Sequence, residues 1–472
     1  MEKSARLVNI KENLKKFFDS PLYPMLVGAM MLLAHVFGIE LYVHFVNAPL
    51  CALAFLVCDS IKPFIVVLCT FVFQASRLTL DCNIDTANNF YSGWRIALAI
   101  VAVGFVLICA VYFYIKHNKI SPEKLKSLPM LPAAAFLSLA FLLNGAFSAG
   151  WSFGTLSYGA IQVICFFVLF YLFLLGFDGE DREELVRYFA LVTAVIASVL
   201  VLEVGWLYIS NDELFVNGAI VKEEVQFGWG NWNTMGQQLV MTIPMLFYGV
   251  MKCRFPWIYF GIATLATLGA VLTLSRNALI FAVLTYCACC VIACFFGRMK
   301  KAFRVLIPLG ILGLVLFAVI FREKILNLLD DYVNRGLSDN GRFDLWREGL
   351  EGFLEAPVFG KGFYGLYPEV EFTGGVFPWM AHNTVVELLG ALGIFGLVAY
   401  LFYRFETVRI FVCRPSLEKT LLGMSMLTII LGSLLDNFLF YVQPMFYYSI
   451  ALAIAYKLSE EKEKAHLSEK TI

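Results

Sequence analysis

Two side chains stand where they could act on a substrate rather than on bulk solvent. His382 lies in the segment PWMAHNTVVELLG, where a polar, aromatic loop becomes an apolar helix, and it is one of only five histidines in the chain. Arg276 lies in TLSRNALI, a short polar turn between two long apolar runs. A guanidinium so close to hydrocarbon is costly, so we expect Arg276 to face a cavity or a partner.

The two residue types suit one kind of chemistry. An imidazole can accept a proton near neutral pH. A guanidinium stays charged and can meet two phosphate oxygens at once, which stabilises a departing phosphate group. Each residue also has a plainer interpretation: His382 as an interfacial histidine with its hydrogen bonds satisfied, and Arg276 as a cation that reaches lipid headgroups from a hairpin tip.

The rest of the composition is that of an integral membrane protein. The 472 residues are 60% hydrophobic and only 15% charged, with a mean hydropathy of +0.76, whereas about a quarter of the residues in a soluble domain are charged. Apolar runs long enough to cross a bilayer as helices recur along residues 23–458. We therefore predict one all-α, polytopic transmembrane bundle of 12 to 14 spans. The candidate spans are centred near residues 30, 52, 69, 105, 138, 167, 198, 243, 264, 286, 312, 394, 428 and 448.

The distribution of lysine and arginine predicts the orientation. Basic flanks stay in the cytoplasm, and an inside N-terminus places 26 of the 36 basic residues on that side and 10 on the other. On this assignment residues 1–22 form an amphipathic cytoplasmic segment rather than a signal peptide. Residues 459–472 form a cytoplasmic tail.

Two outer connections are long, 211–233 and 322–382, and a long loop is usually functional or disordered. The second contains two amphipathic patterns, which predict helices lying on the outer membrane surface and covering the spans. The stripe of the first consists of Ile325, Leu328, Leu329, Tyr332 and Val333, and that of the second of Phe343, Trp346, Leu350, Phe353 and Leu354.

Glycines dominate the segment PVFGKGFYGLYP at 357–368. Gly360, Gly362 and Gly365 permit close backbone approach and positive φ. We favour a structural turn here over a phosphate-binding loop, because Gly-x-Gly alone is common in turns.

Several polar residues fall within or beside the apolar spans. Glu203 is an intramembrane carboxylate, so we expect it to face a cavity or form an ion pair. Asn383 and Glu387, four residues apart, share a helix face, and Glu387 is expected to support helix packing rather than to orient His382. Asp436 and Asn437 are interpreted as a turn.

Four stretches in order resemble the O-antigen ligase and O-antigen polymerase family of bacterial polytopic glycosyltransferases. They are GWGNWN, LSRNAL, GRFDLWREGLEGFLEAPVFGKGF and AHNTVVELLGALGIFG, and they are spread from about Phe227 to Gly396, a range of a little over a third of the chain. The first seven spans match the family only in hydrophobic character.

The resemblance implies a GT-C-like bundle in the cytoplasmic membrane of a bacterium. It implies transfer of a glycan from an undecaprenyl-diphosphate carrier to a glycan or lipid acceptor on the outer face, with no cofactor. By the family pattern Arg276 holds the diphosphate and His382 activates the acceptor hydroxyl.

The same pattern suggests substrate-binding positions, with one departure. The family often has a second arginine before its Asn-x-Asn segment, whereas the only basic residue in that loop is Lys222. Arg342 and Lys361 from the large loop are alternatives to it. The candidate substrate-binding residues are therefore Lys222, Asn231, Asn233, Arg342, Lys361 and Asn383.

Other readings stay open at this point. No carboxylate cluster suggests a metal, because Asp330 and Asp331 fit the solvated face of a helix, so we predict metal-independent transfer. A flippase or other transporter for lipid-linked glycans is the alternative function, although broken helices in repeated positions would then be expected. Polymerase and ligase cannot be separated, nothing indicates nucleic-acid binding, and the oligomeric state is open.

Overall fold

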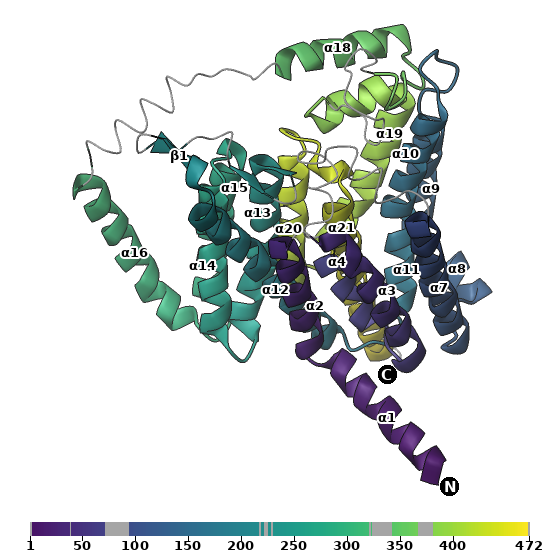
Figure 1. Ribbon diagram of the computed structural model, residues 1–472, viewed down its shortest axis with the longest axis horizontal. Helices are drawn as coiled ribbons and strands as arrows, with labels where there is room; N and C mark the ends of the chain where they lie inside the picture. Colours follow the sequence, from purple (N-terminus) through teal and green to yellow (C-terminus); the bar gives the residue numbers. More distant parts are fainter. Residues whose placement is uncertain are drawn as a thin grey trace.

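The computed structural model describes residues 2–37, 39–70, 94–216, 219–220, 225–227, 230–320, 322, 342–366 and 381–470. Within these residues the chain forms a bundle of helices, with both termini at one end and α18 (Arg342–Glu355) across the other (Figure 1). The predicted all-α, polytopic fold is confirmed. Lys222, the stripe predicted for 325–333, and most of the large outer loop lie outside the described residues.

The first half of the chain is helical almost throughout. The elements described there are α1 (Glu2–Asp19), α2 (Leu22–Phe37), α3 (Glu40–Val57), η1 (Lys62–Val66), α4 (Val67–Thr70), α7 (Trp94–Lys116), α8 (Pro122–Lys126), α9 (Leu131–Leu142), α10 (Phe153–Val163), the π-helical turn η2 (Ile164–Val168), α11 (Leu169–Gly176) and α12 (Arg182–Ser210).

The second half begins with a short turn and two small hairpins. They comprise η3 (Asp212–Leu214), β1 (Phe215–Val216) paired with β2 (Ala219–Ile220), and β3 (Gln226–Phe227) paired with β4 (Gly230–Asn231). The helices that follow are α13 (Trp232–Lys252), α14 (Pro256–Leu272), α15 (Arg276–Phe295), α16 (Lys300–Ile320), α18, α19 (Thr384–Val412), α20 (Leu417–Gly432), η5 (Phe438–Phe440) and α21 (Val442–Lys470).

Each of the fourteen predicted span centres falls in a helical segment. By length and composition, however, only four described helices could cross a membrane alone, or five if the pair Val8–Asp19 and Leu22–Phe37, bent by 67°, counts as one span. Others, such as Pro256–Leu272, are apolar but shorter. The described residues therefore account for four or five of the predicted 12 to 14 spans by length and composition.

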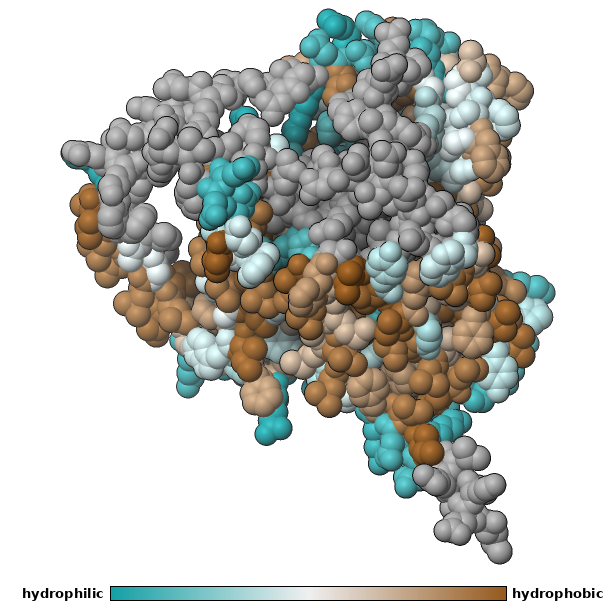
Figure 2. All heavy atoms as spheres, in the orientation of Figure 1, coloured by the Kyte–Doolittle hydropathy of each residue, from teal (hydrophilic) through white to brown (hydrophobic). Residues whose placement is uncertain are grey.

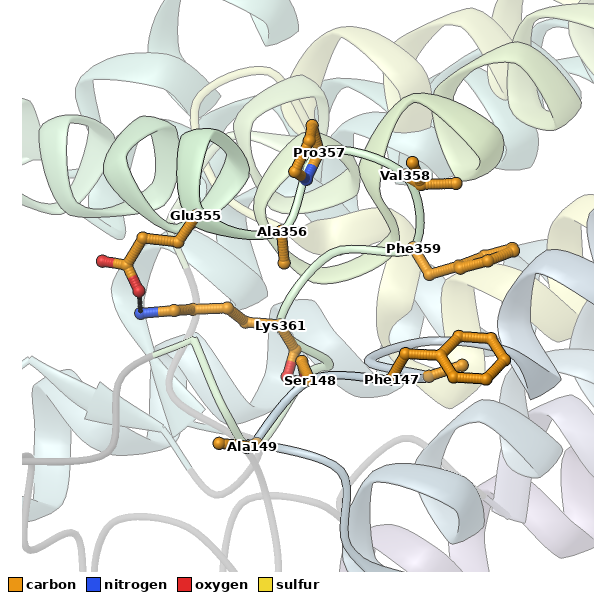
Figure 3. A pocket seen from close by; sticks show the side chains of 11 residues that line it. Phe147, Ser148, Ala149, Glu355, Ala356, Pro357, Val358, Phe359 and Lys361 are labelled. Carbon is orange, nitrogen blue, oxygen red and sulfur yellow. Dashed lines mark hydrogen bonds and ion pairs between the residues drawn. The ribbon is translucent and has the colours of Figure 1, made fainter.

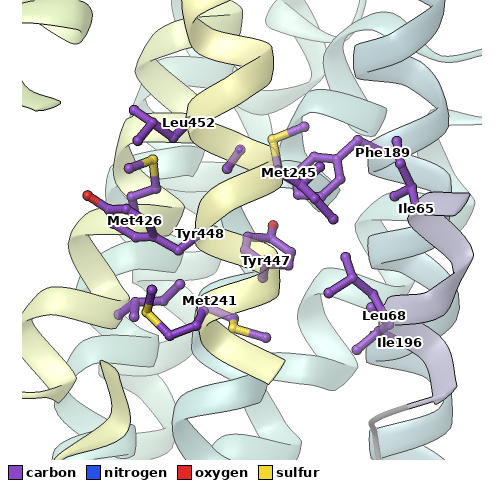
Figure 4. Close-up of a cluster of buried hydrophobic side chains, with 14 of the residues drawn as sticks. Ile65, Leu68, Phe189, Ile196, Met241, Met245, Met426, Tyr447, Tyr448 and Leu452 are labelled. Carbon is purple, nitrogen blue, oxygen red and sulfur yellow. The ribbon is translucent and has the colours of Figure 1, made fainter. Parts of the chain in front are cut away.

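The helices meet in a core of aromatic and methionine side chains. Figure 4 shows Tyr447 of α21 among Phe189 of α12, Met245 of α13 and Ile65 of η1, and all four are fully buried. Elements far apart in sequence thus share one core, which fixes these elements relative to one another.

Ion pairs gather at the end that carries the termini. The ammonium groups of Lys124 and Lys457 approach Asp178 at 2.7 and 3.5 Å, and Lys252 pairs with Glu418 at 3.3 Å. Figure 2 shows apolar side chains around the bundle and hydrophilic ones at this end and over α18. The position of these lysines fits the predicted cytoplasmic side, but the orientation itself stays a prediction.

Helix α19 is interrupted at Gly393, whose φ of 67° and ψ of −164° are not helical. The break exposes backbone groups, and the loop after α18 pairs with them. The N–H groups of Lys361 and Gly362 donate to the carbonyls of Gly390 and Ala391 at 2.8 and 2.9 Å. In return, the N–H of Ile394 donates to the carbonyl of Pro357 at 2.9 Å. The glycine segment therefore locks the outer loop onto the broken helix.

Two glycines make this close approach possible. A Cβ on Gly360 would lie 2.2 Å from the carbonyl carbon of Ala391, and Gly360 and Gly362 have φ of 67° and 83°. Gly365 has no positive φ, but a Cβ there would lie 2.3 Å from the carbonyl oxygen of Lys361. The prediction of a structural turn with close backbone approach is confirmed, and the positive φ holds at two of the three glycines.

Candidate active site

His382 and Asp436 form the centre of the candidate site. Nδ1 of His382 lies 2.9 Å from Oδ1 of Asp436, and the two side chains are 28% and 2% exposed. A buried carboxylate at this distance accepts the Nδ1 proton, which leaves Nε2 as the basic nitrogen of the ring. His382 precedes α19 in a left-handed conformation with φ of 52°, and Asp436 follows α20. The interpretation of Asp436 as only a turn residue was therefore wrong.

A phenol adds to this centre. Tyr441, between η5 and α21, is partly buried and lies near the Asp436 carboxylate. Burial raises the pKa of Tyr441 well above its ordinary value, and the charge of Asp436 raises it further. The phenol therefore stays protonated beside the carboxylate.

The residue before His382 is held from two sides. The N–H of Ala381 donates to Oε2 of Glu387 at 2.7 Å, and Nε1 of Trp346 donates to the carbonyl of Ala381 at 2.9 Å. Glu387 is fully buried and also accepts from Nδ2 of Asn437 at 3.2 Å. Glu387 thus fixes the backbone that carries His382, as well as the turn that carries Asp436. It contacts the peptide beside the histidine rather than the imidazole, so it helps to position His382 through the backbone, a role beyond the helix packing that was predicted for it.

The start of α19 is fixed by capping. Oδ1 of Asn383 accepts from the N–H groups of Val385 and Val386 at 2.9 and 3.2 Å, and these bonds satisfy donors at the helix N-terminus. Both the N–H and the hydroxyl of Thr384 donate to the carbonyl of Ser433, at 2.9 and 2.8 Å. For Asn383 the structure therefore supplies a capping role, and its predicted contact with substrate stays a prediction.

Arg276 is the first residue of α15 and is partly buried. Ser275 caps this helix, and its hydroxyl donates to Oδ1 of Asn233 at 2.7 Å. The capping places Arg276 at the positive end of the helix dipole, where anions are stabilised. Asn233 is thus engaged in fixing the Arg276 turn, while nothing is described of the Asn231 side chain.

Helices α13 and α20 connect the turn that carries Arg276 with the loop that carries His382. α15 and α20 pack against α13, and they also contact each other. A Cβ on Gly236 of α13 would lie 2.8 Å from Oγ1 of Thr273, beside the Arg276 turn, and one on Gly432 of α20 would lie 2.7 Å from Oε1 of Gln237. Ser433 directly follows α20, and its carbonyl accepts the hydrogen bonds from Thr384 near His382. The Arg276 turn and the His382 loop are therefore connected through α13 and α20.

Lys361 belongs to a different part of the outer end. Its ammonium lies 2.6 Å from Oε2 of Glu355. Both residues line a cavity of about 540 Å³ between the turn at Phe147 and the turn after α18 (Figure 3). Arg342, at the start of α18, is partly buried and forms no hydrogen bond or ion pair with any residue that the structure describes. The substrate-binding roles of both residues stay predictions.

The side of α18 that faces the protein differs from the predicted stripe. Gly349 and Gly352 are buried, whereas Phe343, Leu350 and Leu354 are 63%, 45% and 74% exposed. Trp346 and Phe353 of the stripe are partly buried. The helix therefore meets the bundle through its glycines together with Leu345 and Trp346, and the exposed apolar residues face away from the described part of the chain.

Glu203 has a polar partner inside the bundle. Its Oε1 lies 3.2 Å from Nε2 of His35 on α2, and Glu203 is 2% exposed. This pair joins α2 to α12 inside the bundle. It lies apart from the elements that carry His382 and Arg276.

Part of this region of the chain is similar to a known protein family. Residues 261–401 match the family model described as O-Antigen ligase. The resemblance to the O-antigen ligase and polymerase family is confirmed. The family match contains Arg276, Trp346, His382 and Glu387, whereas Asn233 and Asp436 lie outside it. The family description points to glycan transfer in polysaccharide assembly and to a multi-pass protein of a bacterial inner membrane.

A relative points the same way. A curated protein of Klebsiella pneumoniae, described as an uncharacterized 49.5 kDa protein in the cps region, is 23% identical to this chain over 240 residues. The match covers 45% of this chain and 53% of the relative, so this chain spans about half the length of the relative it matches.

Proposed function

We propose that this protein transfers a glycan from an undecaprenyl-diphosphate carrier to an acceptor hydroxyl on the outer face of the cytoplasmic membrane. The observation that carries the proposal is the 2.9 Å contact between Nδ1 of His382 and Oδ1 of Asp436, next to a region that matches the O-antigen ligase family. A partly exposed imidazole oriented by a buried carboxylate has the arrangement expected of a general base.

In the proposed reaction His382 takes up the proton of the acceptor hydroxyl on Nε2. The acceptor oxygen forms a bond to the anomeric carbon of the glycan. The bond from that carbon to the phosphate oxygen breaks, and its electron pair moves onto the departing diphosphate. Asp436 stabilises the imidazolium that forms, because its carboxylate accepts the hydrogen bond from Nδ1 of the ring.

Arg276 is proposed to bind the diphosphate. The negative charge on the leaving group grows as the bond breaks, and a fixed guanidinium at a helix N-terminus stabilises it. Its position in the capped turn holds it in place before the substrate arrives, so little reorganisation is needed.

The test is a reaction of the purified full chain with a lipid-linked glycan and candidate acceptors, with product length read on a gel. The variants His382→Ala, Arg276→Ala and Asp436→Asn should lose product while they keep the wild-type melting temperature. An exposed charge reversal on α18, Arg347→Glu, is the control. Normal product from His382→Ala would refute the proposal, and translocation of the lipid-linked glycan without any new glycosidic bond would support a transporter instead.

The proposed transfer needs no metal. We therefore expect full activity after dialysis against EDTA. Activity that EDTA removes and Mg²⁺ restores would overturn this part of the proposal.

A further inference from the structure

An apolar groove lies between α2, α12 and α14, at the end of the molecule that carries the termini. Figure 1 shows α12 between the other two helices, and both of them pack against it. The groove encloses about 680 Å³ and is walled by side chains such as Ala29 of α2, Val195 of α12 and Ile262 of α14. It shares no lining residue with the His382 site.

The shape of the groove suits an extended hydrocarbon chain. Its wall on α12 runs from Glu184 to Leu202, which at 1.5 Å per residue is roughly 27 Å. Half of the hydrocarbon core of a bilayer is about 15 Å thick, so one lipid tail fits along the groove. The hydroxyl of Ser198, midway along this wall, already donates to the carbonyl of Ala194 at 2.8 Å. The body of the occupant is therefore apolar.

The polar end of the groove carries charges of both signs. Lys62 lies 3.7 Å from Oδ1 of Asp19 and also pairs with Glu184, so these two carboxylates at the rim share one ammonium group. Arg187 pairs with Glu183 at 2.7 Å. The remaining charged group at the rim is the guanidinium of Arg254.

Arg254 is exposed and ready to bind an anion. It lies 5.2 Å from the centre of the Phe255 ring and pairs with no carboxylate among the residues that the structure describes. A guanidinium at the mouth of an apolar groove is the complement of a phosphate that carries a hydrocarbon tail.

We propose that this groove binds one anionic phospholipid, with the phosphate on Arg254 and one acyl chain along α12. The lipid would seal the gap between α2 and α14 and hold the N-terminal helices to the rest of the bundle. The inference is independent of the proposed glycan transfer.

The test is native mass spectrometry of the full chain in a mild detergent, titrated with phosphatidylglycerol and, separately, phosphatidylcholine. We expect one retained lipid per chain and tighter binding of phosphatidylglycerol. Arg254→Gln should weaken phosphatidylglycerol about fivefold without changing phosphatidylcholine, as expected when one basic residue near a membrane surface is lost. The substitution is on the surface, so the fold should be unaffected.

A second variant tests the groove itself. Ser198→Trp places an indole in the apolar channel and should reduce the retention of both lipids. Leu284→Trp, at a position on α15 that is 61% exposed, adds the same side chain outside the groove and is the matched control. Equal affinity for the two lipids, lipid retention unchanged in both groove variants, or a dimer whose partner chain displaces the lipid would overturn the proposal.

Discussion

The indole nitrogen of Trp346 donates to the carbonyl of Ala381 at 2.9 Å, so α18 holds the backbone immediately before His382. This contact connects the helix that covers the outer end to the proposed base. Loss of one such hydrogen bond costs about 0.5–1.5 kcal/mol. We expect Trp346→Phe to reduce kcat several-fold with little change in KM.

The matched control is Trp257→Phe on α14, at a position that is 54% exposed. Steady-state rates of product formation by both variants provide the measurement. A Trp346→Phe enzyme with unchanged kcat would mean that α18 covers the site without positioning the histidine.

Glu387 is predicted to act as a positioning residue. Replacement by alanine leaves the Ala381 N–H and the Asn437 amide without their acceptor, and each buried unsatisfied donor costs about 1–3 kcal/mol. We expect Glu387→Ala to lower kcat more than Glu387→Gln does, since glutamine keeps one acceptor oxygen. The exposed Glu348→Gln on α18 should behave as wild type. Equal activity in the wild type and Glu387→Ala would contradict the assignment.

Lysine should not be able to replace Arg276 at the proposed diphosphate site without loss of activity. A guanidinium binds two phosphate oxygens in a fixed geometry, whereas an ammonium is a point charge on a flexible stem. We expect Arg276→Lys to lower kcat/KM by about tenfold to a hundredfold, less than loss of a transition-state donor usually costs. Arg347→Lys, on the exposed side of α18, is the control. If lysine restores full activity, the bidentate contact is not needed.

Sequence reasoning pointed to Arg276 and His382 as candidate residues but missed the carboxylate that contacts His382. Arg276 and His382 could be found because a lone charged or titratable group beside an apolar run is conspicuous. Asp436 could not, since it is 54 residues from His382 and an Asp-Asn pair after a span looks like an ordinary turn. Only the packing of α20 against α19 brings the two together.

The contact face of α18 is a second feature that the sequence did not reveal. Hydrophobic periodicity identifies an apolar stripe, but this helix meets the bundle partly through small residues. A Cβ on Gly352 would lie 2.6 Å from Cδ1 of Leu366, and one on Gly390 would lie 2.8 Å from the carbonyl oxygen of Gly349. Contacts made by glycines leave no hydrophobic signal, so the protein-facing side of the helix could not be predicted.

The break in α19 gives the last prediction. Gly393 has a positive φ, and a Cβ there would lie 2.4 Å from the carbonyl oxygen of Val358. Alanine at this position is strained by its backbone conformation, by about 1–3 kcal/mol, and must also push the glycine loop away from the helix. Gly393→Ala should therefore lower the melting temperature and, through the displaced loop and α18, the rate of transfer. Gly261→Ala, where a Cβ meets nothing within 4 Å, should leave both unchanged. Thermal unfolding and initial rates are measured on the same preparations. A loss in Gly393→Ala alone would show strain at the break, whereas an equal loss in both variants would show a general intolerance of helix substitutions.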